Sequence, residues 1–291
     1  SNNTASGYQA LFSNTTGNEN TASGYLSLYS NTTGSYNTAS GRQSLYLNTT
    51  GISNTASGYR ALYSNTTASS NTATGYQALF SNTTGANNTA SGNFSLYSNT
   101  TGIDNVANGF YALYLNTTGA SNTAVGVTAL RNNTTGDYNV ASGYAALFSN
   151  TTGTGNVASG YNSLYSNTTG GNNTATGTYA LSGATGGNNT ALGWAAGDNI
   201  TTGSSNIIIG YGIDAPSATD SNQLNIGNWI KRDTAGAITL AHGTTTKLTT
   251  ASTGVSVTGT VAATAFTGDG SALTGLVSDP TMGGDLSGTA S

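Results

Sequence analysis

Residues 20–34 read Asn-Thr-Ala-Ser-Gly-Tyr-Leu-Ser-Leu-Tyr-Ser-Asn-Thr-Thr-Gly, and this stretch recurs with a 17-residue period along most of the 291-residue chain. The glycine that follows Asn-Thr-Ala-Ser keeps this spacing from Gly7 to Gly177. One residue is lost near Gly186, and the same step resumes from Gly193 to Gly227, which gives about 14 units. Seventeen residues rich in Gly, Asn, Thr, Ser and Tyr favour two short strands and two turns over a pair of helices. Each unit therefore predicts one turn of an all-β solenoid.

Stacked turns place equivalent residues in columns that run along the axis, with a rise of about 4.8 Å per turn. Stacked Asn side chains can hydrogen-bond to one another, Gly suits a corner of positive φ, and Leu is expected in a narrow interior. The Asn-Thr-Thr-Gly stretch is expected to form the second turn of each unit. The expected structural columns begin with Asn3, Gly7, Leu11, Asn20, Gly24, Leu28, Asn37, Gly41 and Leu45.

Aromatic residues recur on both sides of the interior leucine. If the stretch after the glycine is extended, Tyr8, Ala10 and Phe12 share the face opposite Leu11. Two aromatic rows then run along the outside of the rod, and they begin with Tyr8, Phe12, Tyr25, Tyr29, Tyr59 and Tyr63. One buried leucine per turn offsets little of the entropy lost in ordering 17 residues, and an exposed apolar stripe indicates a partner. We therefore expect an oligomer of this chain around the rod axis.

The composition leaves little material for catalysis, since charged residues are 5% of the chain, the net charge is −4 and cysteine is absent. We expect no cofactor, no metal site, no nucleic-acid partner and no membrane insertion. His242 is the single histidine, so no catalytic triad can be assembled around a histidine partner. The acidic residues lie mostly at variable turn positions, without the facing pair of a glycosidase or the fixed column of a calcium-binding roll. They include Glu19, Asp104, Asp137, Asp198, Asp214 and Asp220. We expect that the chain is not an enzyme.

Two alternative functions remain open at this stage. The repeated Asn-Thr-Thr stretch matches the N-glycosylation pattern at Asn14, Asn31, Asn48 and Asn65, which would suit a glycosylated cell-surface filament. An ice-binding solenoid is the other alternative, because threonine columns can line a flat face, and Asn-x-Ala-x-Gly resembles the Asn-x-Val-x-Gly unit of grass antifreeze β-rolls. Thr15 and Thr16 speak against it, since neighbouring strand residues point to opposite faces and form no Thr-x-Thr pair.

The pattern fades after Gly227, and two regions are expected: a repeat shaft over residues 1–230 and a β-rich stalk or connector over residues 231–291. The second region contains alternating stretches such as residues 254–261 and Asp-Gly or Gly-Gly turns. Segments this short cannot enclose a sizeable core alone, which favours interlocking chains. We expect both regions to belong to a longer polypeptide.

The repeat unit, together with Ser-Asn-Gln-Leu-Asn-Ile-Gly at 221–227, resembles the repeat regions of phage and prophage tail-fibre proteins. Residues 254–276 and 282–291 are similar to tail-fibre stalks. A looser resemblance is to the β-roll heads of trimeric autotransporter adhesins, although their turns are usually shorter. These resemblances imply a homotrimeric fibre shaft, on a virion tail or a cell surface, that displays a tip for a glycan or receptor. They carry no tip or self-cleavage residue over to this sequence.

Overall fold

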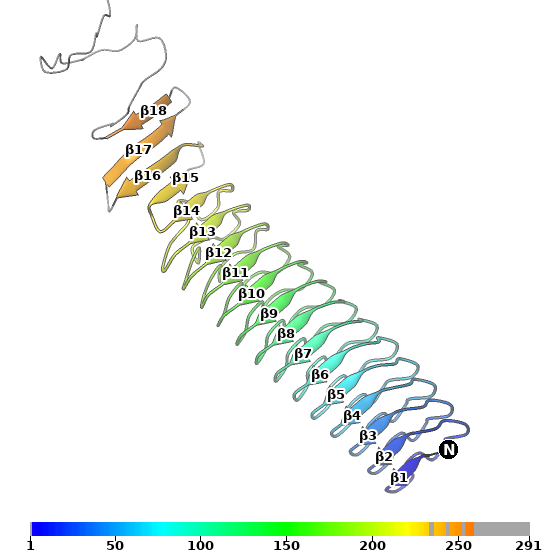
Figure 1. Cartoon of the computed structure of the whole chain (residues 1–291). Coiled ribbons are helices and arrows are strands. Elements are labelled where there is room, and N and C mark those ends of the chain that lie inside the picture. The colour runs from blue at the N-terminus through cyan, green and yellow to red at the C-terminus, as the bar shows by residue number, and fades with distance from the viewer. Residues whose placement is uncertain (1, 233–235, 243–244, 252–253, 259–291) are drawn as a thin grey trace, which may run out of the picture.

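The computed structural model describes residues 2–232, 236–242, 245–251 and 254–258, and these residues are all β with no helix among them. The chain forms a rod in which short strands of successive turns lie one above another along one side (Figure 1). Fourteen three-residue strands, β1 to β14, pair in parallel and bound about 13 turns of a β-solenoid. The all-β solenoid with a 17-residue repeat is therefore confirmed. The strands are β1 (Thr4–Ser6), β2 (Thr21–Ser23), β3 (Thr38–Ser40), β4 (Thr55–Ser57), β5 (Thr72–Thr74), β6 (Thr89–Ser91), β7 (Val106–Asn108), β8 (Thr123–Val125), β9 (Val140–Ser142), β10 (Val157–Ser159), β11 (Thr174–Thr176), β12 (Thr190–Leu192), β13 (Ile207–Ile209) and β14 (Leu224–Ile226).

The register between turns follows the repeat. Ala22 pairs with Ala39 and Ala39 with Ala56, so each strand residue faces its own equivalent one turn away. The deletion near Gly186 is absorbed between β11 and β12, where Ala175 pairs with Ala191 after 16 residues. The pairing thus stays in step although the loop is one residue shorter.

Each turn contains one strand, so the expectation of two strands per turn is wrong. The stretch after the corner glycine is a series of turns in which alternate residues have positive φ, such as Gln43 at 57° and Leu45 at 49°. A backbone of this kind does not send successive side chains to opposite faces, as an extended strand does. Adjacent Ala61 and Leu62 are consequently both fully buried. The column of Ala10 therefore lies inside, and not on the outer face with the aromatic rows.

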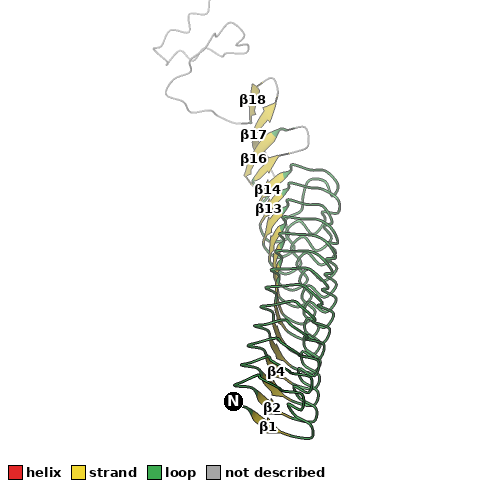
Figure 2. Cartoon of the chain, turned by 90° about the vertical axis from the view of Figure 1, so that its right-hand side faces the viewer, coloured by secondary structure: helices red, strands yellow, loops and turns green. Residues whose placement is uncertain are grey.

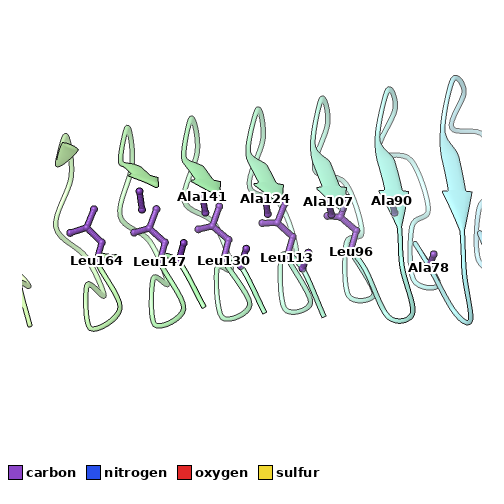
Figure 3. Close-up of a cluster of buried hydrophobic side chains, with 14 of the residues drawn as sticks. Ala78, Ala90, Leu96, Ala107, Leu113, Ala124, Leu130, Ala141, Leu147 and Leu164 are labelled. Carbon is purple, nitrogen blue, oxygen red and sulfur yellow. The ribbon is translucent and has the colours of Figure 1, made fainter. Parts of the chain in front are cut away.

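The interior of the rod is a stack of leucines facing a stack of alanines. Leu96, Leu113 and Leu130 point toward the central alanines of the strands on the opposite wall (Figure 3). Each turn from β2 to β11 buries a strand alanine, a leucine and the small residue before that leucine. Because these side chains are small, the two walls come close and one chain encloses its own core. The estimate of one buried leucine per turn was too low.

A column of asparagines borders the strand. Asn37 is fully buried, its backbone N–H donates to Asn20 Oδ1 at 3.0 Å, and its Nδ2 donates to Gly51 O at 2.9 Å. The same pattern recurs from Asn20 to Asn173. Each amide therefore links its own turn to both neighbouring turns. We call this the strand-side asparagine column.

The corner glycine is required by close contact between turns. Gly75 has φ of 130°, and a Cβ at this position would lie 2.7 Å from the carbonyl oxygen of Gly92. Gly58 and Gly92 have the same positive φ, at 135° and 132°. A side chain here would force adjacent turns apart, which explains the strict glycine period.

The sheet changes character at its C-terminal end. Four antiparallel strands extend it beyond β14: β15 (Ile230–Arg232), β16 (Ile238–His242), β17 (Thr245–Ala251) and β18 (Gly254–Val257). They continue the strip of strands without the loops that close each turn of the solenoid (Figure 2). The expected boundary between residues 230 and 231 falls inside β15. The rest of the expected stalk, residues 259–291, lies outside the described residues.

Candidate functional site: two outer faces of the solenoid

The aromatic residues form two stacked columns on the wall that follows the corner glycine. Tyr8 and Tyr25 stack with ring centroids 5.3 Å apart, and Phe12 and Tyr29 stack at 5.5 Å. The column that starts at Phe12 continues ring on ring through Tyr46, Tyr63, Phe80, Tyr97 and Tyr114. Stacked rings cover one another's faces and leave mainly their edges to solvent. These columns therefore do not form a platform on which sugar rings could lie.

Arginines replace aromatic residues within these columns. Arg42 takes the position between Tyr25 and Tyr59, with its guanidinium carbon 5.5 Å and 5.8 Å from the two ring centroids. Arg131 stands likewise between Tyr114 and Phe148, at 5.7 Å and 5.6 Å. A planar cation over an aromatic face is an attractive contact. The rings thus find stacking partners within one chain, so their exposure does not by itself require a second chain.

The strands carry a second outer face. In β3, Ala39 is fully buried, whereas Thr38 and Ser40 on either side of it are exposed. From β1 to β6 every outward strand residue is a threonine or a serine. We call this strip the hydroxyl face. It consists of Thr4, Ser6, Thr21, Ser23, Thr38, Ser40, Thr55, Ser57, Thr72, Thr74, Thr89 and Ser91.

The hydroxyl face is not the threonine pair considered from the sequence. At the Asn-Thr-Thr corner, Thr32 Oγ1 donates to Thr49 O of the next turn at 3.1 Å, and only Thr33 is exposed. The Thr-x-Ser pair lies instead on the strand, where Thr21 and Ser23 flank a buried alanine. The objection drawn from Thr15 and Thr16 therefore concerned the wrong residues. The alternation in Thr-Ala-Ser was the signal that could have found this face.

The asparagines of the repeated Asn-Thr-Thr stretch are structural. Asn31, Asn48 and Asn65 are fully buried, and Asn48 Nδ2 donates to Asn31 Oδ1 at 2.8 Å and to Gly51 O at 3.1 Å. Asn14 belongs to the same column, because its Oδ1 accepts from Asn31 Nδ2. A glycan would need the nitrogen that makes these bonds. These bonds favour a structural role for Asn14, Asn31, Asn48 and Asn65, whose glycosylation stays a prediction. We call these residues the corner asparagine column.

One pair of acidic residues does meet, contrary to the expectation of isolated carboxylates. Burial and the hydrogen-bonded carboxyl of Asp214 raise the pKa of Asp198 above its ordinary value. The two residues lie in successive loops between β12 and β14. Within the described ranges no group of three or more His, Asp or Glu side chains could hold a metal ion. The same part of the chain contains no helix long and apolar enough to cross a membrane.

Two stacked aromatic columns and one hydroxyl face are thus the outer features that the fold arranges in rows. The chain matches no known family model, and comparisons with curated proteins and with solved structures find no similar protein.

Proposed function

We propose that the chain is a passive, rigid shaft of an extracellular fibre, on a virion tail or a cell surface, and that it has no catalytic role. The observation that carries the proposal is the uninterrupted interior of about 13 in-register turns. Their rise of about 4.8 Å per turn gives a rod on the order of 60 Å long. A tip for a glycan or receptor would lie beyond these residues.

Two features of the shaft suit it to carrying load. Its backbone hydrogen bonds run between turns, for example from Leu45 N to Ala61 O at 3.0 Å, so tension along the rod is shared by many bonds in each turn. Both asparagine columns add side-chain bonds in the same direction. A stack in which each turn contacts only its neighbours can also be lengthened by adding repeats without redesign.

We further propose that the chains of a homotrimer join at the C-terminal sheet. Ile238, Leu240, Val255 and Val257 of β16 and β18 remain 38–60% exposed, and no second layer of described residues lies over them. The shaft, in contrast, encloses its own core. Interlocking of chains at this end would cover these residues, and the number three comes from the resemblance to tail fibres.

Electron microscopy of the purified chain, with sedimentation equilibrium, tests this proposal. We expect micrographs to show rods of uniform width and sedimentation to give the mass of a trimer. The trimer should dissociate when Leu240 and Val255 are replaced by aspartate. The matched variant Tyr25→Asp with Tyr76→Asp, on the aromatic columns, should remain trimeric. A monomeric wild type would contradict the trimer, and hydrolysis of a glycan by the purified chain would contradict the structural role.

A further inference from the structure

We infer that the hydroxyl face binds ice. This inference is independent of the fibre proposal, because it concerns one side of the shaft and neither its ends nor its oligomeric state. The proposed ligand is a regular lattice of water oxygens. It would contact strands β1–β6, which lie one above another along one side of the rod (Figure 2). Three properties of the face support this occupant.

The first property is a two-dimensional repeat. Equivalent threonines such as Thr38, Thr55 and Thr72 pair in register in adjacent strands, about 4.8 Å apart. Within one strand the outward threonine and serine are two residues apart, or about 6.6 Å. Hydroxyl groups therefore form a rectangular array over six turns, with spacings comparable to those between water oxygens on faces of ordinary ice. The surface of a folded protein is irregular, so binding to it would not require such a regular array of hydroxyl groups.

The second property is the state of the hydroxyls. None of the twelve hydroxyls on the face makes a hydrogen bond with another group in the described part of the chain. In contrast, Thr32, Thr49 and Thr66 of the corner each donate to the backbone of the next turn. The face hydroxyls are thus free to bond to ordered water. Because they are mounted on paired strands, little conformational entropy is lost when they do so.

The third property is what the face excludes. The outward positions of β1–β14 contain no charged and no aromatic residue. Charged groups hold their own hydration shells, which would compete with a lattice. Beyond β6, several of the positions become Val106, Val140, Val157 or Ile207, which keep the branched shape of threonine but lose the hydroxyl. The face is therefore strongest in the N-terminal six strands.

Strand propensity alone does not account for this pattern. Threonine is favoured in strands, and its column could be explained in that way. Serine lacks such a preference, yet it fills the second column in five of the six strands, as in Ser23, Ser40 and Ser57. A second copy of the chain is also a poorer occupant, since apposed faces would bury hydroxyls that need paired donors and acceptors.

The test uses the full chain and a small ice crystal, with thermal hysteresis and adsorption of fluorescently labelled protein as readouts. We expect the wild type to show both. In the variant Thr38→Lys with Thr72→Lys, thermal hysteresis and adsorption to ice should both fall by about tenfold or more. The reason is that an unpaired ammonium group is strongly disfavoured on a face that excludes liquid water. These positions are two turns apart, so the two lysines do not repel each other directly.

The matched control is Thr33→Lys with Thr67→Lys, which adds the same charges at exposed corner positions two turns apart. It should retain wild-type hysteresis, and circular dichroism should show that both variants are folded. The inference is overturned if the wild type neither adsorbs to ice nor shows hysteresis, or if face and corner variants lose activity equally. Face-dependent self-association in place of ice adsorption would also overturn it.

Discussion

The shaft and the C-terminal sheet share one continuous row of strands but solve the problem of burial in different ways. In β1–β14 the chain returns after each strand to form a second wall, so Leu79 is fully buried against its own turns. In β15–β18 the strands pair as an antiparallel meander, the described residues form no second wall, and Leu240 stays 41% exposed. The comparison teaches that stability in the shaft comes from contacts within one chain, whereas the sheet depends on what covers it.

The strictness of the repeat follows from the same difference. Where turns stack in register, each residue must tolerate its own copy about 4.8 Å away. Small, neutral or planar side chains do so, and a repeated charge does not. The low charge of the shaft is therefore a consequence of its architecture, and Arg42, Arg60 and Arg131 each occur in a column with uncharged residues immediately above and below.

The largest effect is expected for Gly75→Ala. The added Cβ would lie 2.7 Å from Gly92 O, and the residue would keep φ of 130°, so strain and overpacking together should cost about 4 kcal/mol. Because each turn contacts only its neighbours, the loss should appear as local opening of the turns around β5 and β6. Native-state hydrogen exchange measures it. The matched control is Gly85→Ala, whose added Cβ would also crowd backbone, at the carbonyl oxygen of Gly102, but whose φ is not positive; Ala68 occupies the equivalent position one turn earlier. Equal losses in both variants would contradict the role given to positive φ.

A pair of identical substitutions tests the shaft against the sheet. Leu79→Ala should lower the free energy of local unfolding by about 3 kcal/mol, because it leaves a cavity in a fully closed core. Leu240→Ala removes the same atoms from a half-exposed site and should cost less than about 1 kcal/mol in the isolated chain. Hydrogen exchange of amides near each site gives both values. A loss at Leu240 as large as that at Leu79 would indicate that another chain covers the sheet.

Much of the shaft could be predicted from the sequence, because an in-register stack turns each repeated position into a column. The period predicted the solenoid, and burial of the strand-side asparagines and of Leu28 and Leu45 agrees with an interior assigned by residue type. The conformation after the corner glycine was not predictable by strand alternation. Leucines such as Leu45 adopt positive φ, which residues with a Cβ rarely do, and the repeated contacts between turns hold them there.

The outer faces were harder to predict, since their meaning depends on that conformation. Tyr25 and Tyr29 were expected as an apolar stripe in need of a partner, but the stack itself supplies ring partners. The Asn-Thr-Thr stretch resembled a glycosylation site, because nothing local distinguishes an exposed asparagine from one in a buried column. Thr-Ala-Ser carried the clearest alternation in the repeat and was the one stretch that formed a strand.

An intermediate effect is expected in the corner asparagine column. Asn82 Nδ2 donates to Asn65 Oδ1 at 3.0 Å, and Asn82 Oδ1 accepts from Asn99 at 2.8 Å. Asn82→Ala would remove a hydrogen-bond partner from both Asn65 and Asn99, and should lower the free energy of unfolding by about 2 kcal/mol. The chain contains a natural precedent, because Ala184 ends this column and the buried Oδ1 of Asn167 has no hydrogen-bond partner.

Ala184→Asn is the reverse test of that column. The new amide could donate to Asn167 Oδ1, and we expect a gain of up to about 1 kcal/mol. Thermal melting of the two variants beside the wild type gives opposite signs if the column stabilises the shaft. Destabilisation by both changes would mean that side-chain volume at the corner, and not hydrogen bonding, decides the outcome.

The smallest effect is expected at Asp198→Asn, in the last turns before the sheet. Burial and the hydrogen-bonded carboxyl of Asp214 raise the pKa of Asp198, so the folded chain holds this proton more tightly than the unfolded chain does. The stability gained from protonation is thus present at low pH, and is lost as the pH rises through the folded pKa. Removing the charge should stabilise these turns at pH near 7 by only a few tenths of a kcal/mol, since Asp198 is only partly buried and solvent screens its charge, and should have no such effect near pH 3. Melting curves at the two pH values measure the change, with Asp220→Asn as control. A gain in stability that is equal at both pH values would show that the two carboxyls do not repel each other. The last turns of the shaft would then tolerate a pair of acidic residues as well as the other turns tolerate stacked aromatic rings.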